Sequence, residues 1–175
     1  MKRDYIEFQE RSTPLTYLIT IRAYGTWLHG DERGSMDRRE YNQYGEPKIA
    51  ASELRVTRDR NLMKGAPCVF DSAIRQNIES AIREVCEARG YRLYAINVRT
   101  NHAHTIASAS TKPELMMNSF KSYATRKLRS KDLIGEQTKV WARHGSTRYL
   151  WTEQHIDTAV EYVVNGQGGE LPTFD

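Results

Sequence analysis

Two histidines separated by one residue stand near the middle of the chain, in the stretch 101–105 (NHAHT). On a β-strand, residues two apart point to the same side, so His102 and His104 would face one way with Cα atoms about 6.5 Å apart. Two such imidazoles can bind one divalent metal ion and leave positions for a third ligand, water or substrate. The spacing alone fits two unrelated histidines equally well, so the surrounding elements have to decide.

Composition narrows the class of protein. With 175 residues, 39% of them hydrophobic, the chain is expected to be a single domain over 1–175 that buries a proper core. The net charge of +4 and pI of about 9.1 permit a nucleic-acid partner without requiring one. No run approaches the roughly 20 apolar residues that span a bilayer, so no membrane partner is expected. Cys68 and Cys86 form no metal-type spacing and no disulfide framework, which favours a reducing cytosol.

The elements before the histidine pair begin with a strand. The run 15–24 is rich in β-branched and aromatic residues, which predicts a strand. A polar region over 31–67 then predicts a long loop, which in a compact domain is usually functional or mobile. His29, Asp31 and Glu32 at its start could contact a metal or substrate, although a solvated turn explains them as well.

A helix and two strands follow the polar region. Asp71 predicts the N-cap of an amphipathic helix, and Gly90 stands where its C-terminal stop is expected. The run 91–98 predicts a strand, and the histidines belong to a second strand that meets the first at 99–101. The pair is therefore expected inside a sheet.

The stretch 111–114 (TKPE) has the form of a capping box and predicts a helix to about Arg129. This helix is the most basic part of the chain, and its serine, threonine and lysine side chains suit phosphate contacts, although a solvated face explains the charges equally. Tyr123 could be a nucleophile, but its place on the apolar side favours packing. The basic residues that would make such phosphate contacts are Lys121, Arg126, Lys127 and Arg129.

The last elements are aromatic strands and a helix. The run 140–151 predicts two short strands about a turn at Gly145, and the polar residues beside this turn could contact a ligand. The run 153–165 predicts a helix, with Tyr162 lying off its apolar stripe by about 120°. The full order of elements predicts an α+β fold in which helices pack on a central antiparallel sheet.

A tyrosine and a histidine pair suit one chemistry. A tyrosine phenolate can attack a phosphodiester and hold the released 5′-phosphate covalently, which leaves a free 3′-hydroxyl. A metal ion held by the histidines would polarise the scissile phosphate and offset the charge that develops on it. A metal-dependent phosphodiesterase that uses water in place of tyrosine stays open as an alternative.

The chain resembles the single-tyrosine HUH transposases, and most of all their REP-associated tyrosine transposase branch. The resemblance lies in His102-Ala103-His104 on a strand, the basic helix after it, the aromatic strands and a terminal helix carrying 161–167 (EYVVNGQ). It covers roughly residues 14–168, the expected core, with a loop insertion at about 29–70. It implies the ferredoxin-like, RRM-like fold of HUH nucleases.

The resemblance also implies an activity. The expected enzyme is a bacterial or archaeal transposase that recognises hairpins in single-stranded DNA and cuts and rejoins one strand. It implies Mg²⁺ or Mn²⁺ as cofactor, His102 and His104 as ligands and Tyr162 as nucleophile. Tyr123 is thereby set aside, and its basic helix, with Lys121, Arg126, Lys127 and Arg129, is expected to contact DNA. It implies a cytoplasmic, nucleoid-associated protein that is either a monomer or a homodimer.

One position departs from the family's pattern. In these enzymes a Gln or Asn four residues after the tyrosine often completes the metal site, and here that position is Gly166. Asn165 lies closer to the same helix face, while Gln167 can reach only if the helix end is distorted; the glycines there favour Gln167 as the third ligand. The departure also motivates an alternative function, a domesticated protein that binds hairpin DNA without cutting it.

Overall fold

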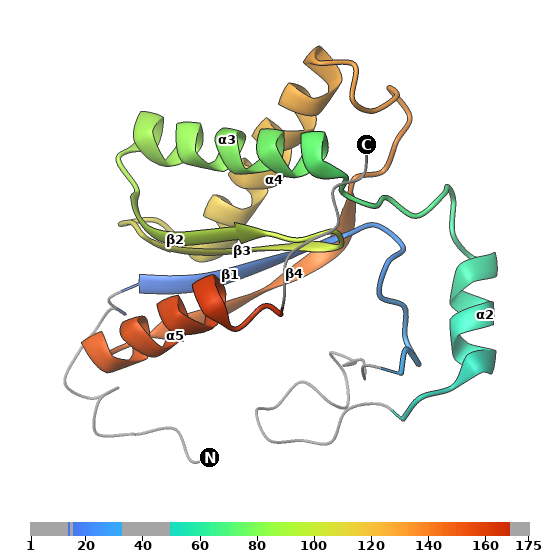
Figure 1. The fold of residues 1–175 in the computed structure, drawn as a ribbon, viewed down its shortest axis with the longest axis horizontal. Helices are drawn as coiled ribbons and strands as arrows, with labels where there is room; N and C mark the ends of the chain where they lie inside the picture. Colours follow the sequence, from blue (N-terminus) through green and yellow to red (C-terminus); the bar gives the residue numbers. More distant parts are fainter. Residues whose placement is uncertain (1–13, 15, 33–49, 169–175) are drawn as a thin grey trace.

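The computed structural model describes residues 14, 16–32 and 50–168, and this part of the chain forms a four-stranded sheet with helices on both faces (Figure 1). The elements are β1 (Thr16–Ala23), α2 (Glu53–Asn61), α3 (Ser72–Arg89), β2 (Arg92–Val98), β3 (His102–Ser108), α4 (Pro113–Ser130), β4 (Trp141–Leu150) and α5 (Glu153–Asn165). Residue 15, the expected start of β1, and 33–49 of the expected loop insertion lie outside the described residues. Among the described helices, none combines the length and the apolar character that crossing a membrane requires.

The sheet has the strand order β2-β3-β1-β4, and each neighbouring pair is antiparallel. Strands β2 and β3 form a hairpin because they are adjacent in sequence and meet at 99–101, as predicted. Helices α3 and α4 cover one face of the sheet and α5 covers the other (Figure 1). The predicted α+β class with a central antiparallel sheet is confirmed.

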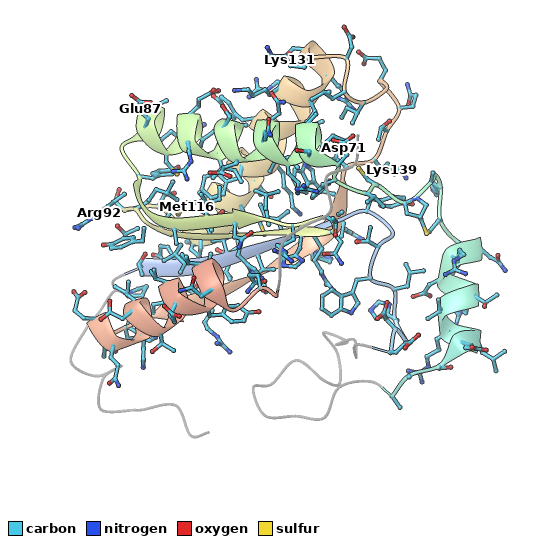
Figure 2. The ribbon with its side chains drawn as sticks, viewed as in Figure 1. Asp71, Glu87, Arg92, Met116, Lys131 and Lys139 are labelled. Carbon is cyan, nitrogen blue, oxygen red and sulfur yellow. The ribbon has the colours of Figure 1, made fainter. Side chains whose placement is uncertain are left out.

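Two cores hold these layers together. The larger core lies between the sheet and helices α3 and α4 and contains Met116 (Figure 2). Met116 and Ile19 are both fully buried in it. The smaller core lies under α5 and contains Leu18, Ile106 and Val163. Since side chains alternate along a strand, the even-numbered residues of β1 and β3 face α5 and the odd-numbered ones face α3 and α4. The histidine pair therefore belongs to the α5 face.

Helix α3 begins and ends where its sequence predicts. The side chain of Asp71 accepts a hydrogen bond from the backbone N–H of Ile74 at 2.8 Å, which satisfies one of the unpaired donors of the first turn. Gly90 ends the helix with a left-handed φ of 66°, a conformation that costs glycine little. Local chemistry thus determines both ends.

Helix α2 lies in the region that was expected to be a loop. Its N-cap is Ser52, whose side chain accepts a hydrogen bond from Arg55 N at 3.4 Å, and Glu53 provides an acidic first turn. No residue of α2 is buried, so the helix lacks the apolar stripe by which helices are recognised in sequence. The loop expectation is wrong over 53–61 for this reason.

Helix α4 begins one residue later than the capping box predicts. Its N-cap is Lys112 rather than Thr111, no side chain caps it, and Pro113 is the first helical residue. Proline suits that position because the N–H it lacks would have no partner within the helix. The proline preference therefore overrides the capping box.

The single strand β4 replaces the two short strands expected about Gly145. Gly145 lies within the strand as the Cα partner of Ile21. A Cβ at Gly145 would stand 2.4 Å from the carbonyl oxygen of Thr20 and 2.5 Å from Sδ of Met117. The glycine allows β4 to approach β1 and α4 closely and makes no turn.

We expect Gly145→Ala to destabilise the protein. The added methyl group would overlap a backbone oxygen that cannot move without disturbing the β1–β4 pairing, at a cost of about 1–3 kcal/mol in the free energy of unfolding. Urea unfolding would measure this loss. Gly65→Ala is the control, because a Cβ at Gly65 would meet nothing within 4 Å. Equal losses in the two variants would contradict the close approach.

Candidate metal and nucleophile site

His102 and His104 lie on β3 with both rings on the α5 side of the sheet. Thr20 of β1 is the Cα partner of His104, and its hydroxyl oxygen lies 2.8 Å from Nδ1 of His104. The ring centroids of the two histidines are 4.6 Å apart and the ring planes make an angle of 68°. The expected geometry of the pair, two imidazoles on one face of a strand, is confirmed.

His104 is the buried member of the pair, with 7% of its surface exposed. Burial, followed by the neighbouring His102, lowers the pKa of His104 to about 4, and a hydrogen bond with Gln167 partly opposes this shift. The imidazole is therefore neutral near neutral pH, and one of its ring nitrogens carries a lone pair that a metal ion could use.

Gln167 reaches the histidine pair from the end of α5. Its Oε1 lies 3.1 Å from Nε2 of His102, while its Nε2 donates a hydrogen bond to the carbonyl oxygen of Tyr162 at 3.0 Å. Nδ1 of His102 lies 2.7 Å from Oδ1 of Asn101. In contrast, Asn165 donates its side-chain amide to Oε1 of Glu161, in its own helix, at 2.9 Å. The structure thus brings Gln167, and not Asn165, to the histidines.

Tyr162 lies beside the same cluster. Its ring centroid is 5.5 Å from that of His104, and 48% of its surface is exposed. The apolar stripe of α5 is buried in the smaller core, so Tyr162 projects from the edge of the packed face, as its offset from the stripe predicted. Asn97 of β2 donates its side-chain amide to the carbonyl oxygen of Val163 at 2.8 Å, which ties α5 to the sheet next to Tyr162.

Three polar residues that sequence analysis did not single out orient this site: Thr20, Asn97 and Asn101. Thr20 and Asn97 are the Cα partners of His104 on its two sides, and Asn101 precedes His102. The available signal was a polar side chain inside each of two largely apolar strands. The sequence does not show which residue such a side chain contacts until the strands are paired, because Thr20 and His104 are 84 residues apart.

The four residues predicted to contact DNA lie on α4, on the opposite face of the sheet from the histidines. Lys121 donates to the carbonyl oxygen of Ala142 at 2.9 Å, and Lys127 contacts the carboxylate of Glu84. Arg129 donates to the carbonyl oxygen of Glu136 at 2.8 Å. These three cations already have acceptors within the protein.

Arg126, the fourth of these residues, is exposed and stacks on Tyr123 with its guanidinium carbon 4.2 Å from the ring centroid. Tyr123 is 42% exposed, so the expectation that it packs on the apolar side of the helix is wrong. Hydrogen bonds from Arg89, followed by Arg126, lower the pKa of Tyr123. The ring lies between two cations instead of in the core.

The candidates at the start of the long polar region do not join the histidine pair. His29 contacts Asp59 of α2, with Nδ1 3.0 Å from Oδ2. Within 14, 16–32 and 50–168, no three His, Cys, Asp or Glu side chains form a cluster that could hold a metal ion. Asp31 and Glu32 therefore belong to no such cluster. Beside Gly145, Thr147 donates to Glu114 of α4 at 3.1 Å, on the far face.

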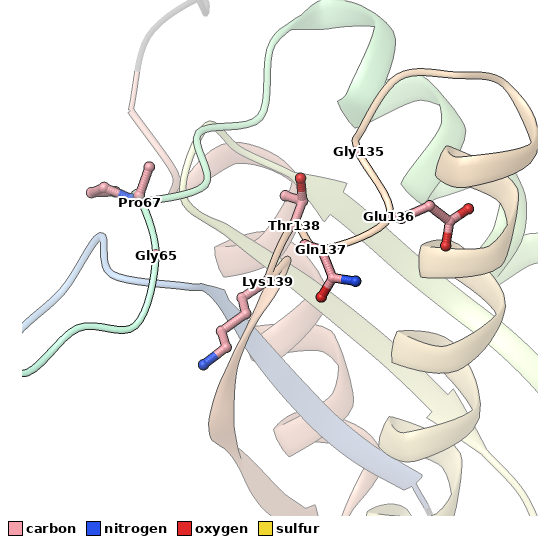
Figure 3. A pocket seen from close by; sticks show the side chains of 8 residues that line it. Gly65, Pro67, Gly135, Glu136, Gln137, Thr138 and Lys139 are labelled. Atoms are coloured by element: carbon pink, nitrogen blue, oxygen red, sulfur yellow. The ribbon is translucent and has the colours of Figure 1, made fainter.

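The described part of the chain also forms a cavity of about 520 Å³ (Figure 3). Segment 65–67 lines one side and residues 135–139, which lead into β4, line the other. None of the predicted site residues lines it. The histidine and tyrosine cluster lies elsewhere, where β3 meets α5.

Acid should destabilise the metal-free protein through His104. Its folded pKa of about 4 is below the value of about 6.5 in an unfolded chain, so the unfolded state alone gains a proton as the pH falls from 6.5 towards 4. The free energy of unfolding, measured in urea with EDTA, should fall by on the order of 3 kcal/mol over that range. His104→Gln should flatten this dependence, because glutamine does not titrate in this range. An unchanged slope in His104→Gln would contradict the burial argument.

Comparison with known proteins places the chain in a family. The family described as "Transposase IS200 like" matches residues 63–165, more than half of the chain. Among solved structures, a REP-associated tyrosine transposase bound to a REP hairpin is 14% identical over 87% of this chain and 68% of its own, with a TM-score of 0.46. A candidate transposase from Deinococcus radiodurans R1 is 10% identical over 97% of this chain and 100% of its own, with a TM-score of 0.49. No curated protein matches the chain.

The family match includes β3 with both histidines, the basic helix α4 and the tyrosine helix α5. It confirms the transposase family that the residue pattern suggested. The chain belongs to the IS200-like transposase family, whose members are enzymes that cut and rejoin DNA.

Proposed function

We propose that this transposase cuts and rejoins single-stranded DNA beside hairpins through a covalent bond between Tyr162 and a 5′-phosphate. The observation that carries the proposal is the meeting of β3 with the end of α5. The ring of Tyr162 lies 5.5 Å from the ring of His104, and Gln167 lies 3.1 Å from His102. A tyrosine hydroxyl beside a set of metal-type donors suits transfer of a phosphodiester to the tyrosine.

The donors in this cluster fit a divalent metal ion. Nδ1 of each histidine contacts an oxygen, from Thr20 or Asn101, which orients the ring and leaves Nε2 as the donor, the usual arrangement of metal-binding histidines. Two imidazole nitrogens with the amide oxygen of Gln167 suit Mn²⁺, with Mg²⁺ as the second candidate. When bound, the ion would supply positive charge that polarises the scissile phosphate.

The protein's own residues would divide the reaction between them. The hydroxyl of Tyr162 gives up its proton to solvent, and its oxygen attacks the phosphorus. The bond from phosphorus to the 3′-oxygen breaks, and that oxygen takes up a proton to leave a 3′-hydroxyl. Rejoining reverses these steps with another 3′-hydroxyl. Tyr162 is half-exposed and accessible to a strand, whereas His104 is buried and stays fixed.

The basic helix α4 is proposed as a second DNA-contacting surface, through Lys121, Arg126, Lys127 and Arg129. Arg126 is best suited to the role, because it is exposed and its guanidinium has an aromatic neighbour rather than a carboxylate. Lys127 contacts Glu84, so it would have to exchange one anion for another. A homodimer and a hairpin partner remain predictions from the family resemblance.

Gly166 motivates a second candidate, a hairpin-binding protein that no longer cuts. A Cβ at Gly166 would lie 2.7 Å from the carbonyl oxygen of Tyr162, so a side chain there would require the helix end to move. The amide of Gln167 reaches the histidines without it. This weakens the reason for regarding the site as inactive.

Incubation with hairpin single strands from the DNA flanking the gene and Mn²⁺ should produce a covalent protein–DNA adduct, detected as a shifted band in a denaturing gel. Tyr162→Phe should abolish it, because the ring remains but the nucleophilic oxygen is gone. Tyr123→Phe is the matched control and should form the adduct as wild type does.

The outcomes separate the candidate functions. An adduct in Tyr162→Phe would exclude Tyr162 as nucleophile. Cleavage by Tyr162→Phe without an adduct would indicate a phosphodiesterase that uses water. Hairpin binding without cleavage by the wild-type protein on every strand tested would favour the non-cutting candidate.

Gln167→Ala should weaken metal binding, because it removes the proposed third ligand. We expect the Mn²⁺ dissociation constant, measured by electron paramagnetic resonance without DNA, to rise by about tenfold or more. Asn165→Ala, two residues away on the exposed side of α5, should leave the constant unchanged. Equal constants in wild type and Gln167→Ala would remove Gln167 from the metal site.

A further inference from the structure

Arg22 of β1 lies next to the histidine pair. It is the Cα partner of His102 in the β1–β3 pairing. Thr20, two residues earlier, has its hydroxyl on His104, so period-two alternation puts Arg22 on the same face of the sheet. Directly opposed residues have Cβ atoms about 5 Å apart, which brings the base of the Arg22 side chain within reach of His102.

The charge of Arg22 is not balanced within the described part of the chain. Its guanidinium forms no hydrogen bond and no ion pair there, although the side chain is half-buried. Burial alone lowers the pKa of Arg22, and no carboxylate opposes that shift. A half-buried guanidinium with unused donors is suited to a ligand that brings negative charge, such as a phosphate group.

Trp27 provides an aromatic surface beside this cation. The guanidinium carbon of Arg22 lies 5.8 Å from the centroid of the Trp27 ring, and the ring is only half-buried. Hydrogen bonds hold the segment that carries it, from Thr26 Oγ1 to Ala23 O at 3.1 Å and from Ala23 N to Asn101 O at 2.8 Å. The second bond ties the segment to the residue that precedes His102.

A cation and a partly buried indole together match the two parts of a nucleotide. Arginine donors bind phosphate oxygens, and indole rings stack with bases of any sequence. Arg92 and Tyr94 form a similar pair, with 4.9 Å between guanidinium carbon and ring centroid, but Arg92 pairs with Ser108 at the opposite end of β3 from His102. Of these two pairs, the Arg22 pair is the one beside the histidines.

We propose that Arg22 and Trp27 form a nucleotide-binding subsite that holds the single strand next to the scissile phosphate. Arg22 binds a backbone phosphate and Trp27 stacks on the base of the same or the adjoining nucleotide. The subsite rests on the proposed function, because single-stranded DNA is its ligand. It would position the strand for Tyr162 without taking part in bond making or breaking.

Two probes separate the base contact from the phosphate contact. One is a fluorescent oligothymidylate of about twelve nucleotides, and the other is the same backbone built from abasic nucleotides, both titrated in EDTA so that no cleavage occurs. Trp27→Ala should weaken oligothymidylate binding by roughly 5- to 100-fold and leave abasic binding unchanged. Trp27→Phe, which keeps a ring, should retain most of the affinity.

Arg22→Gln should weaken the binding of both probes and reduce the slope of log affinity against log salt by about 0.7, the value for one phosphate contact on a single strand. Arg22→Lys should restore the slope. The matched controls Arg92→Gln and Tyr94→Ala should behave as wild type, and circular dichroism establishes that each variant is folded.

Failure of the subsite differs from failure of the proposed function. If wild type forms the Tyr162 adduct but Trp27→Ala and Arg22→Gln bind both probes like wild type, the subsite is wrong and the function stands. A wild type that forms the adduct without binding oligothymidylate also overturns the subsite. If wild type neither binds a single strand nor forms an adduct, the proposed function fails and the subsite fails with it.

Discussion

A buried imidazole can remain in a folded protein only if its polar atoms have partners, and the rest of the site follows from how His104 meets this requirement. Thr20 reaches it from the neighbouring strand β1 and Gln167 from the end of α5. The contact with Thr20 depends on the register between β1 and β3, which pairs Thr20 with His104. A slip of one residue would turn both histidines into the core under α3 and α4.

The two faces of the sheet therefore have different tasks. The face under α3 and α4 carries the larger apolar core and holds β1 and β3 rigidly in register. The face under α5 has a smaller apolar cluster, and the polar residues of β1 and β3 lie beyond its edge. A side chain on a central strand is well supported, since the backbone of that strand is hydrogen-bonded on both sides. Tyr162, at the border of α5, is half-exposed instead.

Sequence reasoning failed where burial, rather than local preference, decides the outcome. Helix α2 has no buried face and so produced no periodic signal. Glycine is common in turns, but Gly145 lies within β4, where this strand approaches β1 and α4 closely. Tyr123 stands near the apolar positions of α4 but is exposed between two arginines. For Gly145 and Tyr123 the sequence indicates a residue type, but neighbours from distant parts of the chain, Thr20 and Arg89, decide its surroundings.

The sequence by itself determined the elements that carry the chemistry. Helix α3 begins after Asp71 and ends at Gly90, and strand alternation puts His102 and His104 on one face. The apolar stripe of α5 leaves Tyr162 outside the core. Each of these features depends on residues that are close together in the sequence. Only the tertiary structure decided what those residues meet. The choice of Gln167 over Asn165, the partners of His104 and the place of Arg22 beside His102 depend on strand register and on how the last helix ends, and both are set by packing across the whole chain.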